Sequence, residues 1–267
     1  MLLAVEIDNS AINFGLYEDY NDYKFTKNFK VATDLKKTSD EYVVIVDSIL
    51  TYHGIERSQI NAAVVSSVVP QLTDIILAVV KCLSGIEAMV VGKGIKTGFP
   101  IKVDSPADLG ADLVANAAAV IDIMKKDNKG KSPCVIIDMG TATTIFAINA
   151  KGEYIGGSII PGVGISLDVL RGRTAQLPNV TPLVPTRAIG KNSHESVRSG
   201  VILGNAIMID GFIRKFADEM KCGDNIEVFI TGDYAESVMP VCEHSMRYIP
   251  ELTLIGLCCI YRNNIKA

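Results

Sequence analysis

The residue types best suited to chemistry lie close together near the middle of the chain. A carboxylate ends an apolar strand pattern, and a glycine and three hydroxyl side chains follow in the run Asp138-Met139-Gly140-Thr141-Ala142-Thr143-Thr144. Small residues let backbone N–H groups approach phosphate oxygens, and hydroxyl groups add donors. A carboxylate can hold a cation that offsets phosphate charge. The run is compatible with a phosphate-binding turn, but composition alone favours an ordinary Gly-Thr hairpin, because threonine is common in strands.

A matching turn, Asp8-Asn9-Ser10, follows the strand pattern of Met1–Ile7. It lacks glycine, and an aspartate facing a triphosphate repels it unless a cation lies between them. Taken alone, this is a plain turn. The strand–turn–strand unit nevertheless occurs twice, near residue 8 and near residue 140. The repetition predicts an internally duplicated α/β protein with a cleft between its halves.

Another carboxylate, Asp112, lies where Pro106–Leu113 opens an alanine-rich helix that we expect to run from Gly110 to about Lys126. An ionised carboxylate in a first helical turn is stabilised by the helix dipole, so a capping role explains the residue. The alternative role is that of a general base, which accepts the hydroxyl proton during phosphoryl transfer to an alcohol. Both roles stay open at this point.

Two further turns precede helices. The glycine-rich run Gly156–Gly164 lies before the helix expected at Gly164–Arg173, where backbone donors converge, and predicts either a substrate wall or a tight crossover. The run Ile230–Ala235 joins a strand to a helix, a place where a nucleoside can lie against the backbone. An ordinary strand–helix turn explains the second run equally well.

The remaining apolar periodicities complete an α/β pattern. The expected strands are Ala11–Tyr17, Lys24–Val31, Asn61–Val65, Ala88–Val91, Cys134–Asp138, Thr144–Ile148, Glu153–Ile159 and Ile226–Thr231, and the other expected helices are Ser39–Tyr52, Pro70–Cys82, Ser193–Met220 and Leu252–Tyr261.

The composition narrows the class of protein. The chain has 267 residues, 48% of them apolar and 21% charged, which is typical of a globular protein with two domains. Its net charge is −4, and its Lys and Arg residues are scattered, so we expect no nucleic-acid partner. The six cysteines show no C-x-x-C spacing and are interpreted as reduced thiols. We expect no signal peptide and no membrane span, and therefore a cytoplasmic protein.

Several motifs, taken together and in order, resemble those of one known family. Asp138–Thr143 resembles the family motif D-x-G-T-A-T, and Gly156–Gly162 resembles G-G-x-I-x-P-G. The other matching runs are Ser66–Pro70, Gly110–Asp112, Arg173–Pro178 and Ile189–Ser193. The family is that of the type III pantothenate kinases, in the superfamily of actin, acetate kinases and sugar kinases. The resemblance extends from Met1 to about Leu257.

The resemblance implies two ribonuclease-H-like domains, as in actin-like ATPases, with an interdomain cleft. We expect them at residues 1–112 and 113–267. It implies transfer of the γ-phosphoryl group of ATP to pantothenate, the first step towards coenzyme A. It also implies Mg²⁺ with the ATP, a monovalent cation (K⁺ or NH₄⁺), and a homodimer. The apolar stretch Leu113–Met124 also favours the homodimer, because it has more apolar faces than one domain needs to cover.

By motif position, the resemblance assigns roles to single residues. Asp112 would be the general base, Asp138 would hold the monovalent cation, and Glu6 would hold the divalent one. ATP would contact Thr141 and the residues of the first turn and its flanks, namely Glu6, Ile7, Asp8, Asn9, Ser10, Ala11, Ile12 and Asn13. Pantothenate would contact Gly110, Ala111, Asp112, Leu113, Val103 and Thr174.

Five positions depart from the family pattern. Glu6 and Asp8 stand where the opening motif D-x-G-N-T-N has aspartate and glycine. Leu113 replaces the arginine of G-A-D-R, Val103 a tyrosine that contacts substrate, and Asp233 the second glycine of T-G-G. Asp8, Leu113 and Asp233 motivate an alternative interpretation, a catalytically impaired paralogue that acts as a ligand-binding or regulatory protein.

Overall fold

The structure of the protein is a computed structural model, of which residues 1–19 and 21–265 are described. It consists of two compact units. The first unit comprises Met1–Phe99, Asp104–Ile123 and Glu251–Ala267, and the second comprises Pro100–Val103 and Met124–Pro250. The units therefore do not divide at residue 112, where we expected the boundary, and the carboxy-terminal helix groups with the amino-terminal unit. The expected domain end at residue 267 lies outside the described residues.

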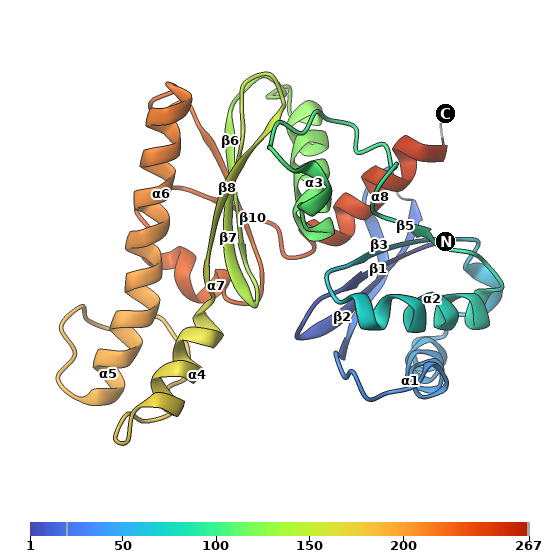
Figure 1. Ribbon diagram of the computed structural model, residues 1–267, viewed down its shortest axis with the longest axis horizontal. Helices are drawn as coiled ribbons and strands as arrows, with labels where there is room; N and C mark the ends of the chain where they lie inside the picture. The colour runs from blue at the N-terminus through green and yellow to red at the C-terminus, as the bar shows by residue number, and fades with distance from the viewer. Residues whose placement is uncertain (20, 266–267) are drawn as a thin grey trace. The chain divides into compact units, whose positions relative to one another are not determined.

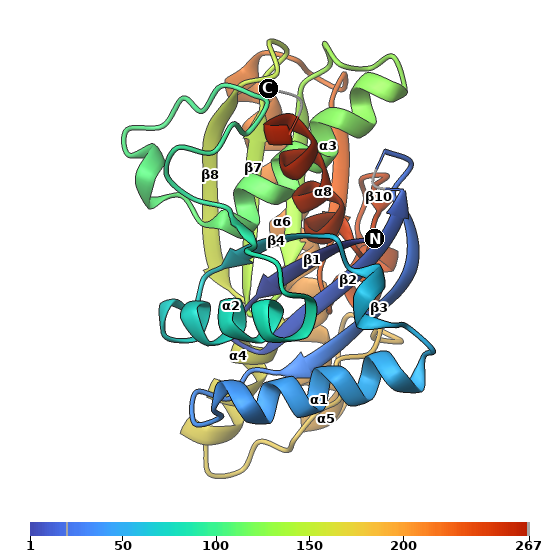
Figure 2. The same cartoon turned by 90° about the vertical axis from the view of Figure 1, so that its right-hand side faces the viewer.

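The first unit contains a five-stranded sheet with the order β3-β2-β1-β4-β5. Figure 2 shows β3, β2, β1 and β4 side by side. Its strands are β1 (Leu2–Ile7), β2 (Ala11–Asp19), β3 (Lys24–Ala32), β4 (Ala62–Ser67) and β5 (Met89–Val90). The first three strands pair antiparallel, whereas β4 pairs parallel with both β1 and β5.

The second unit repeats this topology strand for strand. Its sheet has the order β10-β9-β6-β7-β8, with β6, β7 and β8 antiparallel and with β9 parallel to both β6 and β10. The strands are β6 (Cys134–Met139), β7 (Ala142–Ile148), β8 (Tyr154–Pro161), β9 (Glu227–Thr231) and β10 (Arg247–Tyr248). The predicted internal duplication is confirmed, and each unit has the strand order of a ribonuclease-H-like domain.

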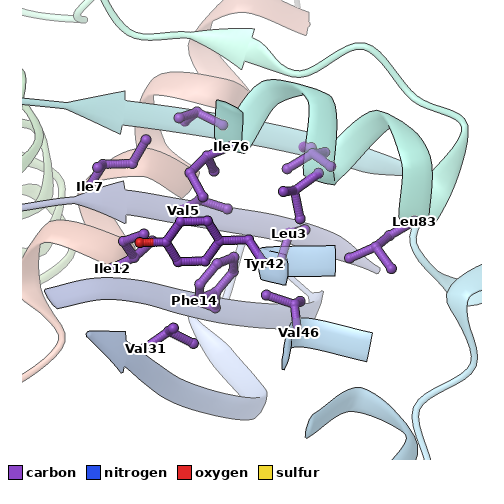
Figure 3. Packing of buried hydrophobic residues seen from close by; sticks show 14 of the residues in the cluster. Leu3, Val5, Ile7, Ile12, Phe14, Val31, Tyr42, Val46, Ile76 and Leu83 are labelled. Carbon is purple, nitrogen blue, oxygen red and sulfur yellow. The ribbon is translucent and has the colours of Figure 1, made fainter. Parts of the chain in front are cut away.

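Helices α1 (Ser39–Tyr52) and α2 (Pro70–Ser84) cover one face of the first sheet (Figure 2). Alternate residues of the strands point towards them because successive side chains of a strand face opposite sides. The core between sheet and helices is apolar and includes Leu3, Val5, Ile7, Ile12, Phe14, Val31, Tyr42, Val46, Ile76 and Leu83 (Figure 3). The start of α1 is fixed by a capping box between Thr38 and Glu41.

Helices α3 (Ala111–Lys126) and α8 (Leu252–Ile265) complete the first unit, and α8 packs against β1 and β4 on the face opposite to α1 and α2. The two helices cross closely at Gly256, where an added Cβ would lie 1.8 Å from the carbonyl oxygen of Ala115. Beside this crossing, the buried hydroxyl of Thr253 donates to Asn116 Oδ1 at 2.9 Å. This packing explains why a helix from the end of the sequence belongs to the first unit.

In the second unit, a helical run lies along one face of the sheet (Figure 1). It consists of α5 (Ser193–Arg198), a π-helical segment (Ser199–Leu203) and α6 (Gly204–Met220), and α4 (Val163–Arg173) and α7 (Ala235–Val238) pack against the π segment. Ser193–Met220 is long and apolar enough to cross a membrane by length and composition. Half of its most apolar window is buried, as in a core helix, with Ile202, Ile209 and Ile213 in the apolar core of this unit.

Two helix glycines allow the α3–α8 crossing to be tested with a matched control. Gly256→Ala should lower the free energy of unfolding by about 1–3 kcal/mol, because the new methyl group must displace backbone of α3. Gly211→Ala in α6 meets open space and should instead raise it by about 0.5–1 kcal/mol. Urea unfolding followed by circular dichroism measures both values. Equal effects of the two substitutions would contradict the close crossing.

Candidate functional site

The turn between β1 and β2 is held by its own polar groups. The backbone N–H of Asp8 donates to the carbonyl of Ala11 at 3.0 Å, and the hydroxyl of Thr33 donates to the carbonyl of Asp8 at 2.6 Å. The hydroxyl of Ser10 donates to Asp8 Oδ2 at 3.1 Å. Asp8 does not have a positive φ. The replacement of glycine by aspartate therefore adds bulk and charge at this turn without backbone strain.

The predicted ATP-binding run spans residues with different surroundings. The side chains of Ile7 and Ile12 are fully buried in the core, so these two residues can offer only backbone groups to a ligand. Asn9 and Ser10 are exposed, and Ala11 is half-buried. The polar side chains accessible in this turn are thus those of residues 8, 9 and 10.

Glu6 is the last polar residue of β1 and is half-buried. From β2, Asn13 Nδ2 donates to Glu6 Oε2 at 2.8 Å. On the other side, Ser66 of β4 is in register with Glu6. Asn13 Oδ1 and Ser66 Oγ are buried and have no hydrogen-bond partner among the described residues. This set of carboxylate, amide and hydroxyl oxygens fits a hard divalent cation such as Mg²⁺.

Asp112 is the second residue of α3, and its carboxylate lies over Gly110, where an added Cβ would be 2.3 Å from Asp112 Oδ1. Burial raises the pKa of Asp112, and the negative charge of Asp8 raises it further, while the backbone N–H of Leu113 acts in the opposite direction. Asp112 is therefore a carboxylate of increased basicity, which is a requirement for a general base. The backbone hydrogen bond is also compatible with the capping role.

The other predicted substrate contacts of the first unit adjoin Asp112. Gly110 and Ala111 are half-buried. Leu113 is buried, with 8% of its surface exposed, so the family's arginine is replaced here by an apolar side chain within the fold.

In the second unit, Asp138 occupies the position in β6 that corresponds to Glu6 in β1. Thr144 of β7 and Thr231 of β9 flank it in register. Thr144 Oγ1 is buried without a hydrogen-bond partner among the described residues, and Thr231 Oγ1 donates to the carbonyl of Pro250 at 3.4 Å. A carboxylate with two hydroxyl oxygens beside it suits a hard cation that prefers oxygen ligands.

Two glycines, Gly162 and Gly232, allow their segments to pack closely against the end of β6 and the Gly140–Thr141 turn that follows it. An added Cβ at Gly162, which precedes α4, would lie 2.3 Å from the carbonyl oxygen of Thr141. Gly232 has a φ of +97°, and an added Cβ would lie 2.5 Å from the backbone of Met139. The next residue, Asp233, is exposed, so its side chain is accommodated where the second glycine of the family motif would stand.

Val103 and Thr174 also belong to the second unit. Val103 is half-buried, and an added Cβ at Gly156 would lie 4.0 Å from Val103 Cγ1. Thr174 is exposed, and its hydroxyl donates to the carbonyl of Leu170 at 2.7 Å, at the end of α4. The predicted residues thus divide between the units, with Glu6–Asn13 and Gly110–Leu113 in the first and the others in the second.

In the sequence, Thr144 is one of three hydroxyl residues of the predicted phosphate-binding turn, whereas Ser66 and Thr231 had no individual role. The signal that marks them is their register beside Glu6 and Asp138, which exists only once the strands are paired. Ser66 belongs to a run that matched the family motif, whereas the two threonines fit ordinary strand composition.

Solved structures place the fold in a class. The chain resembles a conserved Baf-family protein of Campylobacter jejuni, described as a transcriptional activator (TM-score 0.62, 17% identity, 99% of this chain and 100% of that one). It also resembles a Sinorhizobium meliloti protein described as a 2-dehydro-3-deoxygalactonokinase (TM-score 0.58, 11% identity, 98% and 96%). With its two ribonuclease-H-like units, the protein has the actin-like fold of these structures.

The sequence relatives define the family within that class. Residues 2–215 match the family model of type III pantothenate kinase. Type III pantothenate kinases of Moorella thermoacetica and Pelobacter propionicus are each 36% identical over 264 residues, which is 99% of this chain and 100% of either relative. The chain belongs to the type III pantothenate kinase family. This family implies ATP with a divalent metal as phosphoryl donor and pantothenate as acceptor.

The raised pKa of Asp112 has a consequence for stability. The pKa of such a carboxyl group is higher in the folded than in the unfolded state. Its ionised form therefore destabilises the fold at pH values above the folded-state pKa. This destabilisation is lost as the pH falls towards the unfolded-state pKa of about 4. Asp112→Asn should therefore be more stable than the wild type at pH 7, and the difference should shrink at acidic pH. Chemical denaturation at several pH values measures it. A constant difference would contradict the raised pKa.

Proposed function

We propose that this protein transfers the γ-phosphoryl group of ATP to pantothenate and so forms 4'-phosphopantothenate for coenzyme A biosynthesis. The observation that carries the proposal is the carboxylate of Asp112, desolvated and raised in pKa at the start of α3, in a chain that matches its family over nearly its whole length. A coupled assay with ATP, pantothenate, Mg²⁺ and K⁺ tests it. Absence of 4'-phosphopantothenate under these conditions would reject it.

In the proposed mechanism, Asp112 accepts the proton of the pantothenate hydroxyl as the γ-phosphoryl group is transferred in line. The pKa raised by burial makes the carboxylate a stronger base at neutral pH than an exposed aspartate. Gly110, Ala111, Leu113, Val103 and Thr174 contact pantothenate. Most of the rate enhancement comes from positioning and charge neutralisation, as is usual in phosphoryl transfer.

Each duplicated half has one turn to which we assign a contact with ATP phosphate. In the second turn, Thr141 contacts phosphate, and the packing of Gly162 against it brings the amino terminus of α4 to the same turn. The ATP-binding run Glu6–Asn13 contains the first turn. Side chains of Asp8–Ser10 and backbone groups of the flanking residues are available to ATP there. Because residues 9 and 10 are exposed, their side chains can donate to phosphate oxygens.

Each unit also provides one carboxylate for a cation. Glu6 holds Mg²⁺, and Asp138 holds a monovalent cation, K⁺ or NH₄⁺. Each carboxylate is flanked by oxygen-bearing side chains on both neighbouring strands, which supports these assignments. The cations supply positive charge that offsets the triphosphate.

The alternative, a catalytically impaired paralogue, rested on the departures at Asp8, Leu113 and Asp233. Asp8 fits its turn without strain, Leu113 is accommodated in the interior, and Asp233 is exposed at its turn. Asp112 remains at the start of helix α3, and Asp138 remains near the end of strand β6. No observation specifically favours the alternative.

We further propose that the enzyme is a cytoplasmic homodimer that binds neither nucleic acid nor a membrane. The apolar residues of α3 that suggested an interface are largely buried within the chain, so another surface must supply it. Support comes from the edge strand β8, where Ile155 and Ile159 are exposed, since exposed edges favour association. Sedimentation at micromolar concentration that shows only the 28.7 kDa monomer would contradict the dimer.

Asp112→Asn tests the general base. The substitution preserves shape and removes the proton acceptor, so kcat should fall by roughly 10²–10⁴-fold. Binding of ATP, measured by calorimetry, should be retained because Asp112 is assigned to the acceptor substrate. An unchanged kcat would leave Asp112 with the structural role alone.

Asp8→Gly and Asp8→Asn test the charge in the first turn. At an effective dielectric near 20, two like charges about 4 Å apart repel by about 4 kcal/mol, so wild-type ATP affinity should depend strongly on divalent metal. Both substitutions should tighten ATP binding and also lower the pKa of Asp112, because the charge of Asp8 raises it. Because Asp8→Asn preserves the size of the side chain and removes only its charge, it distinguishes the effect of charge from the effect of size. Weaker ATP binding by both variants would show that Asp8 is a productive ligand.

A further inference from the structure

We propose that Asn13 and Ser66 form, together with Glu6, the part of the divalent-metal site that the first unit contributes. Glu6 supplies the carboxylate, Asn13 fixes its position, and the free oxygens of Asn13 and Ser66 accept hydrogen bonds from waters that the metal retains. The inference rests on the proposed function, since ATP brings the metal. It assigns Asn13 and Ser66 as positioning residues.

Strand register places the three side chains side by side. Glu6 is opposite Asn13 in the antiparallel β1–β2 pair and opposite Ser66 in the parallel β1–β4 pair. Residues paired in this way lie about 5 Å apart and project from the same face of the sheet. That face is opposite to the apolar core with α1 and α2, because Val5 and Ile7, the neighbours of Glu6, point into that core (Figure 3).

The hydrogen bonding at Asn13 and Ser66 is incomplete in a way that points to a ligand. Asn13 uses its Nδ2 on Glu6, but its Oδ1 is buried without a partner among the described residues. Ser66 is 1% exposed, and its hydroxyl is likewise without a partner in the described part of the chain. A buried polar atom left unsatisfied costs about 1–3 kcal/mol. Water molecules bound to Mg²⁺ are strong donors and would satisfy both oxygens.

The duplicated half carries the same arrangement at the equivalent positions. There the carboxylate of Asp138 lies between Thr144 and Thr231, and Thr144 Oγ1 is again buried without a partner among the described residues. One step deeper in that sheet, the corresponding row is apolar: Ile136, Phe146 and Phe229. In the first unit the next row, Ala4, Gly15 and Val64, also lacks polar side chains. The same change from a polar to an apolar row behind each carboxylate favours a shared cation-binding design over chance.

Asn13 has a particular task in this chain because residue 6 is glutamate where the family motif has aspartate. The extra methylene adds a rotatable bond, so an unrestrained carboxylate would lose more conformational entropy on binding a metal. The 2.8 Å hydrogen bond from Asn13 restrains one carboxylate oxygen. Partners that orient metal-binding groups typically contribute 10–100-fold to metal affinity.

Binding of Mn²⁺ tests the inference without any turnover. The probe is Mn²⁺ titrated into the full-length protein with a non-hydrolysable imido analogue of ATP, followed by water proton relaxation enhancement, which responds to protein-bound Mn²⁺. Asn13→Leu and Ser66→Ala should each weaken Mn²⁺ binding about tenfold or more. The matched control is Asn28→Leu, since Asn28 Nδ2 donates to Glu251 Oε1 at 2.9 Å in an exposed pair, and it should have no effect.

A double-mutant cycle separates positioning from a general effect on folding. Once Glu6→Gln has removed the carboxylate, Asn13→Leu should weaken Mn²⁺ binding little further. Wild-type affinity in Asn13→Leu and Ser66→Ala, with melting curves that show folded protein, would overturn the inference. So would a full additional loss from Asn13→Leu in the cycle. A protein that shows the expected Mn²⁺ pattern but forms no 4'-phosphopantothenate would reject the proposed function and leave the metal site standing.

Discussion

The structure depends on the pairing of one central strand in each half with an antiparallel neighbour on one side and a parallel neighbour on the other. This register determines which side chains stand beside the carboxylates of Glu6 and Asp138. A shift of one residue would exchange the two faces of the sheet and bury the carboxylates in the apolar core. The apolar residues that alternate with them therefore fix the geometry of the chemistry as well as the stability of each unit.

Local signals predicted most elements because they agree with the tertiary structure. Helix α1 begins and ends where the capping residues and apolar spacing indicate, and the strand–turn–strand repeat was visible near residues 8 and 140. Other features have no local signal. The two-residue strand β10 is too short for periodicity, and the membership of α8 in the first unit depends on its contact with α3 at Gly256.

The same holds for the candidate site: some of its residues are recognisable from the local sequence, and others only from the pairing of strands. The carboxylates and glycines are recognisable in sequence because few residue types can perform their tasks. That Ser66 and Thr144 lie beside a carboxylate follows only from strand register, since a serine or threonine in a strand does not by itself indicate a site. The turn after β1 also differs from its duplicate in length: five residue steps separate the paired Ile7 and Ile12, but four separate Met139 and Thr143. The longer turn gives Asp8 room.

Asp8 has opposite effects on two requirements of a kinase, the binding of phosphate and the basicity of the catalytic carboxylate. In the proposed site its charge opposes the approach of phosphate. The same charge raises the pKa of Asp112 and so increases the basicity of the proposed catalytic carboxylate. Glycine at this position would remove both effects together. On the proposed assignment, the residue that departs from the family pattern exchanges nucleotide affinity for base strength. A divalent cation at Glu6, two residues away, would reduce the repulsion only when ATP and metal bind together.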